Sequence, residues 1–73
     1  MDLERGTVRF YRGDREFGFI IPDDGRADVF VHAYTLELSG IETLNRGDRV
    51  EYERVADNRG VQAYRLQLVP AAP

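Results

Sequence analysis

The sequence predicts an all-β fold, a five-stranded antiparallel barrel, and three observations support this prediction. In several short apolar segments, two kinds of side chain alternate along the chain, and this two-residue period is that of a β-strand. Clusters of Gly, Asp, Asn and Pro separate these segments and are typical of hairpin turns. The chain has only 73 residues, and closing a small sheet into a barrel removes the strand edges that an open sheet would expose.

The predicted strands follow one another through short turns, except at one long connection. In order, the strands are residues 5–12, 17–22, 28–33, 48–55 and 60–69. Turn signals lie at residues 12–15, 22–25 and 57–60. The connection 34–47 is expected to cross one end of the sheet. It contains at most one helical turn, because Gly40 interrupts any longer helix.

Length and composition limit the possible functions. One domain, residues 1–69, accounts for nearly the whole chain, and the tail 70–73 is expected to be disordered. Cysteine is absent and histidine occurs once, so the sequence predicts no disulfide, no metal site and no cofactor. No apolar run reaches membrane-spanning length, and the first residues are acidic where a signal peptide is basic. We therefore expect a cytoplasmic protein with no membrane partner.

Aromatic side chains occupy alternate positions in the second and third predicted strands, and so share one face of each. These residues are Phe17, Phe19, Phe30 and His32. The opposite faces carry the β-branched residues Ile20, Val29 and Val31. Phenylalanines are most often core residues, but the opposite face is already suited to the core, which favours an exposed aromatic platform. Unpaired nucleobases are the commonest flat, partly apolar ligand for such a surface.

The charge balance predicts few phosphate contacts. The chain carries 13 acidic and 10 basic residues, for a formal net charge of −3, so no large basic surface is expected. All the basic residues are arginine. Arginine pairs with phosphates and stacks on bases, which suits single-strand binding, although a codon bias of the source genome would produce the same composition.

Several segments resemble a known family. Phe17-Gly18-Phe19-Ile20 and Val29-Phe30-Val31-His32 are similar to the two ribonucleoprotein-type motifs of the cold-shock domain, a five-stranded OB-fold barrel. Residues 6–11, 44–50 and 58–63 resemble that family's first strand, its entry to strand four and its last hairpin turn. The resemblance covers the chain from about residue 4 to residue 68.

The resemblance implies binding of single-stranded RNA or DNA, RNA chaperone activity with weak sequence preference, and no catalysis. Bases would stack on the rings while arginines follow the backbone. The candidate binding residues are Arg9, Phe10, Arg15, Phe17, Phe19, Asp28, Phe30, His32 and Arg59. Each arginine has the alternative of a solvated ion pair, Asp28 that of capping a turn, and His32 that of a structural hydrogen bond.

Four positions depart from the family pattern. They are Phe10 in place of tryptophan, Glu16 in place of glycine, and Ala33 and Ile41 in place of further aromatic residues. Two stacking positions are therefore expected to be weakened, with Tyr34 or Tyr64 as candidate replacements. Glu16 is also expected to place a negative charge beside the platform.

Phe10 raises a structural question, because in a regular strand it shares a face with Val8, a predicted core residue. A bulge in the first strand is needed to free the ring. Two other functions stay open. The barrel could dock a protein through its aromatic face. A small enzyme is disfavoured, since no nucleophile, base and orienting group recur at workable spacing. A monomer is expected rather than a homodimer.

Overall fold

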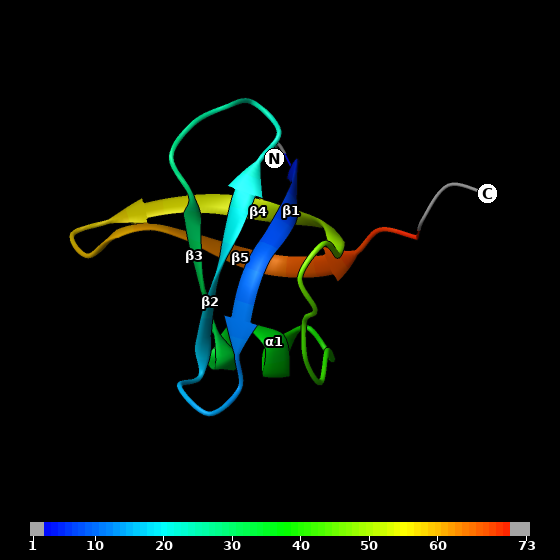
Figure 1. The fold of residues 1–73 in the computed structure, drawn as a ribbon. Coiled ribbons are helices and arrows are strands. Elements are labelled where there is room, and N and C mark those ends of the chain that lie inside the picture. Colours follow the sequence, from blue (N-terminus) through cyan, green and yellow to red (C-terminus); the bar gives the residue numbers. More distant parts are fainter. Residues whose placement is uncertain (1–2, 71–73) are drawn as a thin grey trace.

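The computed structural model describes residues 3–70, which form five strands and one short helix. In chain order the elements are β1 (Leu3–Arg12), β2 (Phe17–Pro22), β3 (Val29–His32), α1 (Ala33–Leu38), β4 (Arg49–Asp57) and β5 (Gly60–Leu68). The strands close into a barrel in the order β1-β2-β3-β5-β4 (Figure 1). The all-β barrel expected from the sequence is confirmed. The expected tail reaches into residues 71–73, which lie outside the described part of the chain.

Strand β1 joins the two halves of the barrel. Its first half, residues 3–7, pairs with β4, and residues 6–12 pair with β2. The pairs β1·β2, β1·β4, β2·β3 and β4·β5 are all antiparallel. The exception is the contact that closes the barrel, in which β3 and β5 run parallel and Phe30 is opposite Gln62. The hairpin of β4 and β5 extends beyond the rest of the barrel (Figure 1).

The bulge expected in β1 is present at Arg9. Val8 pairs with Ile20 and Phe10 with Phe19, so Arg9 is the extra residue between the two pairs. One extra residue reverses the alternation of side chains along a strand. Val8 therefore points into the core, while Phe10 lies on the opposite side of the sheet with the aromatic residues of β2.

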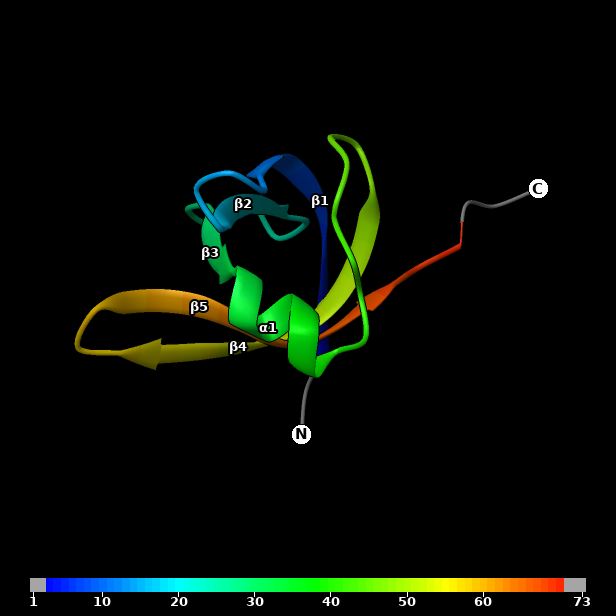
Figure 2. The same cartoon turned by 90° about the horizontal axis from the view of Figure 1, so that it is seen from below.

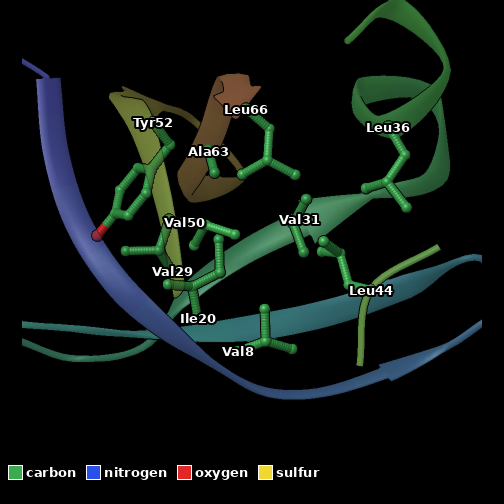
Figure 3. Packing of buried hydrophobic residues seen from close by; sticks show 10 residues of the cluster. All are labelled: Val8, Ile20, Val29, Val31, Leu36, Leu44, Val50, Tyr52, Ala63 and Leu66. Carbon is green, nitrogen blue, oxygen red and sulfur yellow. The ribbon is translucent and has the colours of Figure 1, made fainter. Parts of the chain in front are cut away.

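The core fills the barrel with mainly aliphatic side chains from every strand, from α1 and from the connection after it (Figure 3). Its buried members are Val8, Ile20, Val29, Val31, Leu36, Leu44, Val50, Tyr52, Ala63 and Leu66. Gly18 allows β1 and β2 to approach closely, because a Cβ there would collide with the carbonyl oxygen of Phe10 and lie 2.9 Å from the Cα of Tyr11. The inward side of β2 and β3 thus carries the residues that the sequence assigned to the core.

Helix α1 lies across one end of the barrel (Figure 2). The expectation that the third strand continues to residue 33 was wrong, because Ala33 is the first residue of this helix. His32 supplies the N-cap: its imidazole Nδ1 accepts a hydrogen bond from the backbone N–H of Tyr34 at 3.1 Å. Leu36 is buried in the core, and the connection does contain a short helix, as the sequence allowed.

Candidate nucleic-acid interface

Five rings form one continuous cluster on the side of β1, β2 and β3 opposite the core. The four phenylalanine rings are half-buried and the histidine is exposed. Their neighbouring centroids lie 5.6–6.3 Å apart, mostly in tilted or edge-to-face arrangements. We call this cluster the aromatic face, and its members are Phe10, Phe17, Phe19, Phe30 and His32. All five were candidate binding residues from the sequence, and the structure brings them together.

Strand register explains the order of the rings. Phe19 is opposite Phe10 on one side and Phe30 on the other, so these three rings form a row across the sheet. Phe17 is opposite His32 in the next row. The bulge at Arg9 is what adds the β1 ring to the first row, since a regular strand would turn Phe10 inward.

A groove of about 720 Å³ adjoins the aromatic face and extends toward β5. Its lining residues are Phe19, Asp28, Phe30, His32, Tyr34, Thr35, Arg59, Val61, Gln62 and Tyr64. Sequence reasoning missed Thr35, Val61 and Gln62, and it named the two tyrosines only as replacement rings. On β5, the small apolar Ala63 between Gln62 and Tyr64 could have indicated that these two side chains point outward, since Ala63 is buried and neighbouring residues of a strand face opposite sides.

Arg9 and Asp28 form an ion pair with each other at the edge of the aromatic face. Arg9 Nε donates to Asp28 Oδ2 at 2.5 Å, and its second guanidinium nitrogen donates to Oδ1 at 3.2 Å. Hydrogen bonding to this carboxylate raises the pKa of Arg9 further above its usual value. The sequence left two roles open for Arg9, phosphate contact and an ion pair, and in the unbound protein Arg9 forms the ion pair.

Two arginines near this surface, Arg15 and Arg59, have no acidic partner in the part of the chain that the structure describes. Arg15 lies in the β1–β2 turn, and Arg59 lies in the β4–β5 turn and lines the groove. Within residues 3–70, neither side chain forms an ion pair. The backbone N–H of Arg59 donates to Asp57 Oδ1 at 2.8 Å, which fixes the turn while leaving the guanidinium free.

The connection between β2 and β3, which leads to Asp28, is held by ion pairs to other strands. Arg49 on β4 makes two hydrogen bonds of 2.7 Å to Asp23 and holds the pKa of that carboxyl below its usual value. Arg54 on β4 bonds Glu4 at 3.0 Å and lies 3.7 Å from Asp24. These contacts restrain the segment that leads into β3 and the groove.

The departures at Glu16 and Ile41 have different structural consequences. Glu16 has a positive φ of 61°, a conformation in which glycine is favoured over residues with a Cβ. Its carbonyl oxygen accepts the N–H of Ala33 at 2.9 Å, so this strained residue holds the start of β2 against α1. Ile41 is half-buried and packs against the core, which makes it a structural residue outside the aromatic face.

Other kinds of site find no support in the described part of the chain. Between residues 3 and 70, no group of three or more His, Cys, Asp or Glu side chains is placed to hold a metal ion. None of the helices described there is long and apolar enough to cross a membrane. A small β-barrel with an accessible aromatic face is the class of protein that the geometry defines.

Comparison with known proteins identifies the family. The family described as the 'Cold-shock' DNA-binding domain matches residues 4–69. This chain therefore belongs to the cold-shock domain family, as the sequence resemblance indicated.

Individual relatives agree with this assignment. A "Probable cold shock protein A" of Mycolicibacterium smegmatis is 43% identical over 92% of this chain and 100% of its own length. A "Cold shock-like protein" of Aquifex aeolicus is 38% identical over 89% of this chain and 93% of its own. Among solved structures, "drosophila Unr CSD456" superposes with a TM-score of 0.75 at 26% identity. That match covers 94% of this chain and 27% of the larger protein.

Proposed function

We propose that this protein binds single-stranded RNA or DNA by stacking unpaired bases on the aromatic face. The observation that carries the proposal is the convergence of five rings on one solvent-accessible side of three strands, opposite a core that is already filled. Membership of a DNA-binding domain family supports it. Base stacking on an aromatic ring is worth about 1–3 kcal/mol and works for every base, so sequence preference is weak.

The backbone of the bound strand meets a small number of arginines. Arg15 and Arg59 are free to contact phosphates. Arg9 reaches a phosphate only by leaving Asp28, which reduces its net contribution. Release of Asp28 in turn provides an acceptor for an exocyclic base amine, the ligand role considered for it from the sequence.

Binding of this kind opens weak base pairs without ATP, and this is the physical meaning of an RNA chaperone. The protein traps strands that unpair spontaneously, because the aromatic face accepts only unstacked bases. The free energy of binding has to exceed that of the pairs displaced. Only marginal hairpins therefore open, and stable hairpins stay folded.

The other functions considered from the sequence receive no support from the comparisons. Docking of a protein on the aromatic face is not favoured by membership of a nucleic-acid-binding family. The proposal includes no catalytic step. The proposal also includes a monomeric state, because the aromatic face has to remain open to bind a strand. It places the protein in the cytoplasm.

A titration with fluorescently labelled oligothymidine at low salt tests this function. The wild-type protein is expected to bind, and Phe30→Ala is expected to weaken binding by roughly 1–3 kcal/mol while the barrel stays folded. Leu68→Ala is the matched control, because Leu68 is an exposed apolar residue, 46% accessible, outside the aromatic face. Failure of the wild type to associate up to roughly 100 μM, the weak end of ordinary non-specific binding, rejects the function.

Opening of a quenched hairpin tests the chaperone step separately. A hairpin with a marginal stem should open as protein is added, whereas one with a long GC-rich stem should not. Phe30→Ala should require more protein for the same effect. Tight binding to a single strand without any opening of marginal hairpins would contradict the chaperone proposal and leave the binding proposal standing.

A further inference from the structure

The groove beside the aromatic face contains two tyrosines that the proposed stacking residues do not include. Tyr34 is the second residue of α1 and is 60% exposed. Tyr64 lies on β5 and is half-buried. Both line the groove, together with His32 and Arg59. The groove volume of about 720 Å³ is in the range of sites that accept a small organic group.

Tyr64 lies on the groove side of β5. β3 and β5 run parallel, and Phe30 is opposite Gln62. On β5, side chains two residues apart point to the same face, so Tyr64 lies on the same side of the strand as Gln62. The buried Ala63 between Gln62 and Tyr64 fits this alternation. Tyr64 thus lines, from a fourth strand, the groove that His32 also lines.

Tyr34 reaches the same groove from α1. The hydrogen bond from its backbone N–H to His32 Nδ1, 3.1 Å long, fixes the start of the helix at the edge of the aromatic face. The position before it is Ala33, where the family usually has a ring. The exposed Tyr34 ring has no packing partner in the core cluster, so its surface is available to a ligand.

We propose that Tyr34 and Tyr64 form a further base-binding subsite, which holds one nucleotide beyond those on the aromatic face. This inference rests on the proposed function. A nucleobase is the occupant that the groove favours, because the groove is continuous with the aromatic face and Arg59 lines it with a guanidinium free of ion pairs within residues 3–70. The cation meets the phosphate of the added nucleotide while the phenol rings contact its base.

A length series of oligothymidines, roughly 3 to 10 nucleotides, tests the subsite, because this range covers the site sizes of single OB folds. Wild-type affinity should rise in steps as each position is filled. Tyr64→Ala should bind the shorter oligonucleotides like the wild type and should lose the last step, a loss of about fivefold or more. Tyr64→Phe, which keeps the ring, should restore that step.

Tyr34→Ala provides a second variant whose folding is not at risk, since the side chain is mostly exposed. It should lose the same step. Leu38→Ala is its control, because Leu38 is an exposed residue of the same helix and does not line the groove. Loss of the last step in Leu38→Ala as well would assign the effect to the helix and overturn the subsite.

Tyrosine emission gives an independent readout. The chain has no tryptophan and four tyrosines, and Tyr52 is buried in the core. Oligonucleotides long enough to reach the subsite should quench the emission, and the double variant Tyr34→Ala/Tyr64→Ala should show almost no length-dependent quenching.

Two results overturn the subsite while leaving the proposed function intact. One is a Tyr64→Ala protein that matches the wild type at every length. The other is a uniform loss at all lengths, which would place Tyr64 within the main binding surface or the fold. Absence of any binding by the wild type would instead reject the proposed function itself.

Discussion

Glu16 provides a prediction in which strain and charge can be separated. Its backbone φ is 61°, and residues with a Cβ pay roughly 1–2 kcal/mol in this left-handed region. Glycine avoids that strain but loses about 0.5–1 kcal/mol more in conformational entropy on folding. Glu16→Gly should therefore be more stable than Glu16→Ala by about 0.5–1 kcal/mol, with Glu16→Asn between them because asparagine tolerates this conformation.

Thermal unfolding followed by circular dichroism measures the difference. For a domain of this size, that stability gap raises the melting temperature by roughly 2–8 °C. The alanine variant is the necessary control, because it removes the same carboxylate and keeps the strain. The side chain of Glu16 is exposed and forms no ion pair within residues 3–70, so no lost contact obscures the comparison. Equal melting temperatures for the glycine and alanine variants would refute the reasoning.

The same variants separate the electrostatic effect on binding. Glu16→Gly and Glu16→Ala both remove a negative charge next to Phe17, and both should bind oligothymidine more tightly than the wild type at low salt. The gain should fade as salt rises, because screening weakens interactions between exposed charges. A gain that appears only in the glycine variant would indicate that the turn geometry, rather than the charge, limits binding.

Three further predictions follow from the site and the core. Phe17→Ala or Phe19→Ala should weaken single-strand binding by roughly 1–3 kcal/mol each with little loss of stability, whereas Val31→Ala should first lower stability because its side chain is fully buried. If only Arg15 and Arg59 contact phosphates, log affinity should fall against log salt with a slope of about −1.4, or about −0.7 per contact. Burial raises the pKa of Tyr52 to about 12, so folding stability should fall as the pH rises from about 10 toward 12, since the unfolded phenol ionises first.

Each of these expectations has a clear contrary result. Unfolding in every phenylalanine variant would show that the rings are structural. A flat salt dependence would return the arginines to the role of solvated charges. For the pH dependence, Tyr52→Phe is the control: it should reduce the loss of stability above pH 10, and it deletes a hydroxyl that has no hydrogen-bond partner within residues 3–70. A part of the loss should remain, because burial and the charge of Glu16 also raise the pKa of Tyr11. An undiminished alkaline loss in Tyr52→Phe would assign the effect to groups other than Tyr52.

The sequence predicted the parts of this fold that depend on local alternation. Phe19 beside Ile20, and Phe30 beside Val29 and Val31, define the two faces of β2 and β3 without any knowledge of the partner strands. The bulge in β1 followed from the same logic, because Val8 and Phe10 have side chains suited to different faces.

The features that were missed depend on contacts between distant segments or on unusual local chemistry. A helical turn was expected in this connection, but its start was missed: α1 begins at Ala33 and is capped by the imidazole of His32 in place of the usual Ser, Thr, Asp or Asn. The groove arises where Phe30 meets Gln62 across a parallel pair, a register that no turn sets. Arg9 and Asp28 are 19 residues apart in the sequence. The sequence alone therefore does not show whether Arg9 pairs with Asp28 or contacts a phosphate.

The distribution of ion pairs reconciles an acidic chain with an anionic ligand. Acidic side chains within residues 3–70 neutralise most of the arginines, among them Arg5, Arg49, Arg54 and Arg65, and the arginines left unpaired there are Arg15, Arg46 and Arg59. Two of these three lie in the hairpin turns near the aromatic face and groove. Because exposed charges act over about a Debye length, roughly 8 Å at physiological salt, the local excess of cations matters more to a phosphate than the net charge of −3. With so few cations available, the proposed binding depends mainly on stacking, and the number of accessible rings is then expected to determine how long a strand the protein can hold.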